Sequence, residues 1–174
     1  MQKHLLILLL LLNLTGCTTK FWRSTSRESA GIAPVPAHTT EAVLHVYGAS
    51  VWGVAGLFAI HTWIATKHSN EMAYTIYEVV SVDQVQGPSR LHIEKDIPDR
   101  YWYGARPQLL KEFRGGKEVD ILIESVDRAA KSYPWPDIYN AFPGPNSNTF
   151  TAWVAKRVPE LNLELPFSAI GSGY

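Results

Sequence analysis

Alternating apolar and polar residues in the first half of the chain predict β-strands. Residues Ala42–Tyr47 form a short alternating segment, and Leu57–Ala65 form a longer one in which both faces are largely apolar. A strand with two apolar faces is typical of a central position in a sheet that is covered on both sides. Residues 73–82 are a third β-rich segment, followed by a turn at Asp83–Pro88 and a short strand at His92–Glu94. An antiparallel sheet is therefore expected.

The apolar period changes to that of helices in the second half of the chain. Residues Pro107–Phe113 start with proline, carry Leu and Phe at helical spacing and are followed by a Gly-Gly pair, the signals for a helix start and end. A second helix is expected over Lys117–Lys131, and a third from near Asn146–Asn148 to about Val158, where a proline ends it. The tail beyond it is expected to be extended and packed on the domain. Strands first and helices later predict an α+β domain.

Composition supports one globular domain and excludes several functions. The chain has 174 residues, of which 46% are hydrophobic and 18% are charged, a balance that can bury a core. Lys and Arg together number 16, as do Asp and Glu, so the net charge is zero and nucleic-acid binding by bulk charge is excluded. No glycine-rich phosphate loop follows a strand, and His45 and His92-x-Glu94 lack partners at metal-ligand spacing. Neither a cofactor nor a metal is expected.

The first seventeen residues indicate where the protein is located. Residues 5–12 are an apolar run of Leu and Ile, too short to cross a bilayer and typical of a signal peptide. Leu14-Thr15-Gly16-Cys17 follows and resembles the lipobox of bacterial lipoproteins. The resemblance implies a signal peptide over residues 1–16 and a mature chain that begins with a lipid-modified Cys17. An ordinary secretory signal with a chance cysteine is the alternative.

A lipid on Cys17 would make the membrane the first partner of the protein, because two or three acyl chains fix a protein to a bilayer. Cys17 is the only cysteine, so no internal disulfide forms and core packing has to stabilise the fold. Thr18 is not the Asp that is linked with inner-membrane retention in enterobacterial lipoproteins, so outer-membrane attachment facing the periplasm is expected. Residues 17–40 show no sustained apolar period and are expected to form a linker or a loosely docked arm before a single domain at 41–174.

His61 and Glu78 are the first candidates for chemistry. His61 lies in the strand with two apolar faces, where burial would keep the imidazole neutral and able to act as a base near pH 7. Glu78 shares a strand face with apolar residues, so its carboxylate could orient His61 as the third member of a catalytic triad does. The alternative is a core histidine bonded to a backbone carbonyl, with Glu78 at an exposed sheet edge.

The stretch Pro143–Phe150, with the sequence PGPNSNTF, is the most specific in the chain. It places the hydroxyl of Ser147 at the first turn of a helix, where free N–H groups and a partial positive charge favour an anionic nucleophile or an oxyanion. Asn and Ser are also favoured N-cap residues, so Asn146, Ser147 and Asn148 have a purely structural interpretation as well.

Ile60-His61-Thr62 and Asn146-Ser147-Asn148-Thr149-Phe150 together resemble the permuted papain-like fold of the circularly permuted NlpC/P60 enzymes and the PPPDE peptidases. In those families a strand with His-Thr or similar precedes a helix that opens with Asn-Cys-Asn-x-Phe. The resemblance implies an antiparallel sheet packed against helices, with His61 as the base and Ser147 in the place of the nucleophilic cysteine. A serine hydroxyl, unlike a thiol, needs proton removal during attack. Hydrolysis therefore requires His61 and Ser147 to meet in one cleft.

Residues 42–174 are also identified as a member of the bacterial DUF3750 family, in which the His-Thr-Trp-Ile strand and the PGPNSNTF stretch recur. Membership implies no substrate, because no activity is established for the family. Two functions remain. The first is a serine-dependent amidase or esterase that acts on cell-envelope material through Ser147, His61 and Glu78. The second is a non-catalytic or structural envelope lipoprotein that uses the same cleft for a peptide, glycan or lipid.

Five residues are expected to bind the ligand around this cleft, namely Asn146, Asn148, Trp63, Trp102 and Arg106. The run Tyr101-Trp102-Tyr103, followed by Arg106, could stack on a ligand. The alternative is a core edge, which is common for aromatic clusters beside Gly and Pro. Asp99 and Arg100 are expected to be solvated.

Overall fold

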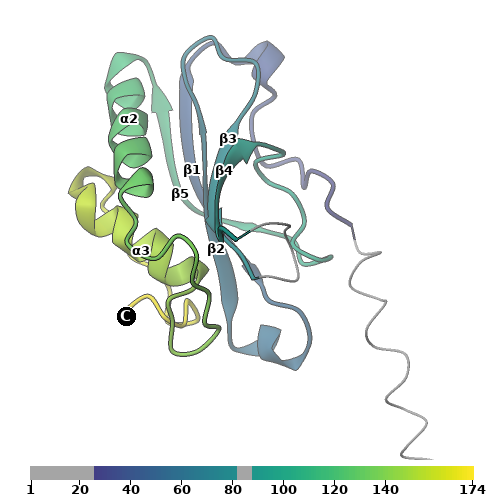
Figure 1. The fold of residues 1–174 in the computed structure, drawn as a ribbon. Coiled ribbons are helices and arrows are strands. Elements are labelled where there is room, and N and C mark those ends of the chain that lie inside the picture. Colours follow the sequence, from purple (N-terminus) through teal and green to yellow (C-terminus); the bar gives the residue numbers. More distant parts are fainter. Residues whose placement is uncertain (1–25, 82–87) are drawn as a thin grey trace, which may run out of the picture.

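The computed structural model describes residues 26–81 and 88–174 (Figure 1). The predicted signal peptide over 1–16, Cys17, the first part of the predicted tether and most of the turn predicted at Asp83–Pro88 lie outside these residues. In the described part of the chain, no helix is both long and apolar enough to span a membrane.

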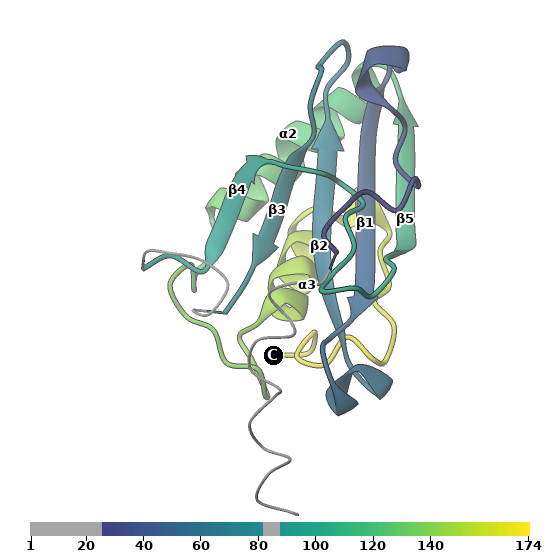
Figure 2. The same ribbon diagram turned by 90° about the vertical axis from the view of Figure 1, so that its right-hand side faces the viewer.

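Five antiparallel strands form one sheet in the spatial order β4-β3-β2-β1-β5 (Figure 2). Almost every residue of the central strands β1 and β2 is buried, as expected for strands that are covered on both faces. The second predicted strand begins later than expected, because Val54–Leu57 form the short 3-10 helix η3 in the loop before it. The strands are β1 Ala42–Ser50, β2 Ile60–Lys67, β3 Thr75–Val79, β4 Leu91–Lys95 and β5 Gln108–Gly115.

Strand β5 replaces the helix predicted over Pro107–Phe113, and that prediction is wrong. β5 pairs with β1, and the register of the pair shifts between Val46 and Tyr47. Such a bulge places an extra residue in one strand and interrupts the strict alternation of faces. Leu110 and Phe113 lie three residues apart, yet both pack against the same core. The bulge therefore gives this strand the apolar spacing of a helix.

Two helices cover one face of the sheet, α2 (Lys117–Lys131) and α3 (Ser147–Arg157), and both lie where the sequence predicts them (Figure 1). The apolar residues of α2 recur every three or four positions, so they form one stripe that faces the sheet. This stripe packs against the inward side chains of β1 and β2 and against α3. The buried members from α2 are Val119, Ile123, Val126, Ala129 and Ala130.

The opposite face of the sheet is covered by the N-terminal arm, residues 26–40, and by the loop at 96–107 (Figure 1). Asp99 joins the two, because its carboxylate accepts hydrogen bonds from the N–H groups of Ile32 and Ala33. Both of these residues also pack on a second apolar cluster on this face. The described part of the predicted tether is therefore docked on the domain.

Replacing Ile123 by Ala tests the placement of α2. Ile123 is fully buried, whereas Ile121 on the same helix is 52% exposed. We expect Ile123→Ala to lower the free energy of unfolding by about 2–4 kcal/mol, because a buried side chain leaves a cavity. Ile121→Ala is the matched control and should change it by less than about 0.5 kcal/mol. Urea unfolding of the purified proteins measures both, and equal losses would contradict the orientation of the helix.

Candidate functional site

His61 and Glu78 meet on the sheet face that carries the arm. His61 is the second residue of β2, and its ring stacks against that of Trp63 on the same face of the strand. Its Nε2 lies 3.1 Å from Oε2 of Glu78 in β3. Both side chains are buried, with 3% and 6% of their residue surface exposed. The structure thus brings together the imidazole and the carboxylate that the sequence pairs.

Arg100 completes an ion cluster with these two residues, and we call His61, Glu78 and Arg100 the His61 cluster. The Nη2 of Arg100 donates a hydrogen bond to Oε1 of Glu78, and the Nε of Arg100 lies 3.5 Å from Oδ2 of Asp96. The expectation that Asp99 and Arg100 are solvated is wrong, because each is only 1% exposed. A buried carboxylate requires hydrogen bonds and a cationic partner, and Arg100 supplies this charge to Glu78 from the loop.

Two tryptophans enclose the His61 cluster. The ring of Trp102 lies parallel to that of His61, with centroids 3.6 Å apart and 4° between the planes. Trp63 donates its Nε1–H to the carbonyl of Pro98 at 2.8 Å. The guanidinium of Arg100 lies 5.6 and 5.8 Å from the ring centroids of Trp63 and Trp102. Both tryptophans are buried, so they pack around the ions and do not line an open groove.

Burial and neighbouring ions set the charges inside the cluster. Burial alone raises the pKa of Glu78, but the Arg100 guanidinium and the hydrogen bond with His61 outweigh it and hold that pKa at about 2. Burial lowers the pKa of His61, and this effect exceeds the opposing influence of Glu78. Glu78 and Arg100 are therefore the charged pair at neutral pH, and a neutral His61 donates its Nε2–H to the carboxylate.

Ser147 faces the other side of the sheet from the His61 ring. Thr62, the next residue along β2, packs against α3, where its hydroxyl lies 2.9 Å from both Asn148 Oδ1 and Thr151 Oγ1. Neighbouring residues of a strand point to opposite faces, so the ring of His61 points away from Ser147. Figure 1 shows α3 on one side of β2 and the arm on the other. The structure does not bring together the nucleophile and base that the predicted triad requires.

The stretch that opens α3 is a helix cap. The side chain of Asn146 accepts hydrogen bonds from the N–H groups of Asn148 and Thr149, and the Thr149 hydroxyl accepts one from the Asn146 N–H. The amide of Asn148 donates to the carbonyls of Ile60 and Ile170 at 2.9 Å each. The N–H groups of Asn148 and Thr149 are therefore used by the cap and are not offered to an oxyanion. Asn146 and Asn148 thus have the structural roles of a capping box and a strand-to-helix bond.

A family model described as a protein of unknown function, DUF3750, matches residues 41–174. The chain belongs to the DUF3750 family. No curated protein and no solved structure matches it significantly. Membership in this family assigns no activity to the domain.

The arm contributes a cation, Arg27, to the aromatic rings of the DUF3750 domain, and the sequence analysis did not predict this contact. The guanidinium carbon Cζ of Arg27 lies 5.8 Å from the ring centroid of Trp102 and 5.7 Å from the ring centroid of Tyr103. Arg106, the residue expected to bind a ligand there, is exposed and donates a hydrogen bond to the hydroxyl of Tyr101 at 3.3 Å. Arg27 was missed because it lies in a segment that the sequence predicts to be a linker.

The open recess of the DUF3750 domain does not reach the His61 cluster. A recess of about 480 Å³ lies beside the arm, with Val35, Tyr74 and Ile97 in its lining. The residues of the His61 cluster are not among those that line this recess. Within residues 26–81 and 88–174, no three His, Cys, Asp or Glu side chains gather as metal ligands would. The His61 cluster therefore has the character of a buried structural ion cluster.

Replacing Glu78 by Gln in the DUF3750 domain tests this role. At neutral pH the variant should lose about 3 kcal/mol of free energy of unfolding, because the buried Arg100 charge loses its partner. The folded-state pKa of about 2 is below the ordinary value of 4.5. The stabilisation by Glu78 is therefore complete above the ordinary pKa and is lost as the pH falls toward the folded-state value. Urea unfolding curves of wild type and variant should converge as the pH is lowered.

The matched control is Glu124→Gln, which removes an exposed carboxylate 3.8 Å from Arg128 on α2. Its free energy of unfolding should differ from that of the wild type by less than about 0.5 kcal/mol throughout. If the deficit of Glu78→Gln stayed constant down to the acid limit, the carboxylate would not be the charged partner of Arg100.

Proposed function

We propose that the protein is a bacterial envelope lipoprotein whose domain binds its partner without catalysing a reaction. The observation that carries this proposal is that the His61 ring and α3, which begins with Ser147, lie on opposite sides of β2. A serine nucleophile needs a base that takes its proton during attack, and the polar β2 side chain that contacts the start of α3 is Thr62 and not His61. The ring of His61 is bonded to Glu78 and covered by Trp102.

We infer that the fold is a permuted papain-like scaffold in which the place of the nucleophile has a structural use. The chain order supports this inference, because the strand with Ile60-His61-Thr62 precedes the helix that starts at Ser147. The two elements also touch where such an enzyme would have its cleft, through Thr62 and Asn148. Hydrogen bonds between strand, cap and C-terminal segment fill this contact.

A lipid anchor on Cys17 is the second part of the proposal, and the lipobox at residues 14–17 supports it. Eight residues lie between Cys17 and Ser26, and a fully extended chain of this length spans about 30 Å. The domain would thus be held beside the membrane, and Thr18 favours the outer membrane with the domain facing the periplasm. A cell-envelope peptide, glycan or lipid is the class of partner that a protein in this position would meet.

Fatty-acid labelling in a bacterium with an outer membrane tests the anchor. The wild-type protein should incorporate an alkyne-bearing fatty acid and fractionate with the outer membrane. Cys17→Ala should lose this label, because the acylated sulfur is absent, while Thr19→Ala should keep it as the matched control. A labelled Cys17→Ala variant, or a wild type without label, would exclude the lipoprotein assignment.

A fluorophosphonate probe tests the absence of serine catalysis. The wild-type protein should be labelled no more than Ser147→Ala, because Ser147 is 3% exposed and the ring of His61 lies on the other face of β2, bonded to Glu78. In-gel fluorescence measures the labelling, with an active serine hydrolase as the positive control. Labelling that disappears in Ser147→Ala and also in a folded His61→Gln variant would show that the protein is a hydrolase.

A further inference from the structure

Three segments meet at the end of the molecule where β2 begins. The N–H of Ile60 donates to the carbonyl of Ser168 at 3.0 Å, and the carbonyl of Ile60 accepts from Asn148 Nδ2 at 2.9 Å. The amide of Asn146 in turn donates to the carbonyls of Ala141 and Ile170. The loop at 51–59, the loop at 138–146 and the segment at 165–171 therefore lie together, and we call these three segments the β2 tip.

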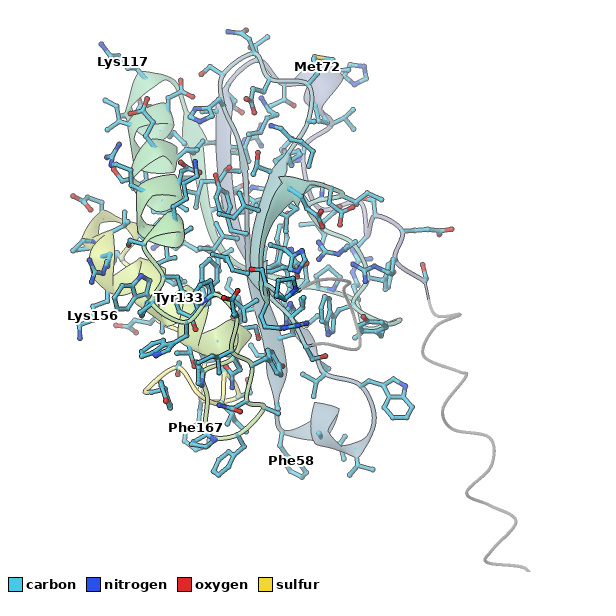
Figure 3. The ribbon with its side chains drawn as sticks, viewed as in Figure 1. Phe58, Met72, Lys117, Tyr133, Lys156 and Phe167 are labelled. Carbon is cyan, nitrogen blue, oxygen red and sulfur yellow. The ribbon has the colours of Figure 1, made fainter. Side chains whose placement is uncertain are left out.

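The β2 tip carries large apolar side chains that the domain leaves exposed. Figure 3 shows Phe58 and Phe167 projecting from this end of the molecule, while Met72 and Lys117 lie at the opposite end. A gathering of exposed apolar side chains on a soluble domain marks a contact surface. The exposed fractions are 50% for Trp52, 79% for Val54, 76% for Leu57, 70% for Phe58, 79% for Phe142 and 103% for Phe167.

The β2 tip also lacks charge. No Asp, Glu, Lys or Arg occurs in residues 42–66, 138–155 or 165–174, although such residues make up 18% of the chain. The opposite end differs, since Lys95 pairs with Glu71 and Arg114 pairs with Glu41 there. An uncharged surface of aromatic and aliphatic side chains can enter the boundary between lipid headgroups and acyl chains without dehydrating an ion.

The lipid anchor places this surface next to a bilayer, and the inference here rests on that part of the proposed function. The eight-residue connection between Cys17 and Ser26 spans about 30 Å at most. Strand β2, with eight residues, is about 27 Å long. The anchor thus keeps Ser26, where the described chain begins, within about one strand length of the membrane, and a weak apolar contact of the domain is favoured by the high local concentration.

We propose that the β2 tip inserts into the headgroup boundary of the membrane that holds the Cys17 lipid. The domain then stands on two contacts, the acyl chains and the apolar side chains of the tip. This orientation directs the hairpin between β2 and β3 and the start of α2 away from the bilayer. The recess beside the arm stays open to an envelope partner.

Site-specific fluorescence on the full lipidated protein in vesicles of phosphatidylethanolamine and phosphatidylglycerol tests the proposal. Leu57→Cys places a thiol on the tip, and Met72→Cys places one at the opposite end, where Met72 is 68% exposed. Each thiol is labelled with a polarity-sensitive maleimide dye, which does not react with an acylated Cys17 sulfur. Lipids with a spin label on the acyl chain should reduce the emission at position 57 about twofold or more and leave position 72 nearly unchanged.

Two results would overturn the insertion. Equal quenching of both positions by aqueous iodide would show that the tip stays in water. A position 57 label that is shielded from iodide but not quenched by the spin-labelled lipids would show that a protein covers the tip. The unmutated protein serves as the control for the anchor. Reaction of its Cys17 with the dye would refute lipidation itself, and this result is distinct from a lipidated protein whose tip remains in water.

Discussion

The two-residue period of β2 is the constraint on which the rest of the structure depends. His61 and Thr62 are neighbours in sequence, but the pleat of the strand sends their side chains into different layers. Thr62 bonds the strand to the start of α3, and His61 bonds it to Glu78 under the loop that carries Arg100. A shift of this strand by one residue would break both sets of contacts at once. Two adjacent side chains thus hold the helical layer and the arm layer to the same sheet.

Local signals made most of the elements predictable. The apolar stripe of α2 and the cap of α3 act within a few residues, and the two apolar faces of β2 directly imply a covered central strand. Strand β5 was not predictable in the same way. Its pairing partner β1 lies far away in the chain, and the bulge gives Leu110 and Phe113 a spacing that local rules assign to a helix. The prediction failed because tertiary pairing decides this segment.

Burial and the alternation of side chains between the two faces of a strand predicted part of the candidate site. A polar residue in an apolar strand needs a partner, and this reasoning correctly joins His61 to Glu78. Arg100 gave no such signal, because nothing in its local sequence shows that the loop turns inward. The pairing with Ser147 failed for another reason. Motif spacing identifies which strand and helix meet, whereas the identity of the contacting side chain depends on the face, and a single position separates His61 from Thr62.

Docking of the arm through Asp99 would shorten the connection between the domain and a lipid anchor on Cys17. The family match begins at residue 41, but packing on the sheet begins at residues before it. With an anchor at Cys17, the span between lipid and domain shrinks from about 80 Å for residues 17–40 to about 30 Å. The hemisphere above a membrane that the start of the docked arm could explore would then be roughly 20-fold smaller. If the anchor exists, a partner farther from the membrane would have to approach the domain, because the short connection would limit how far the domain extends.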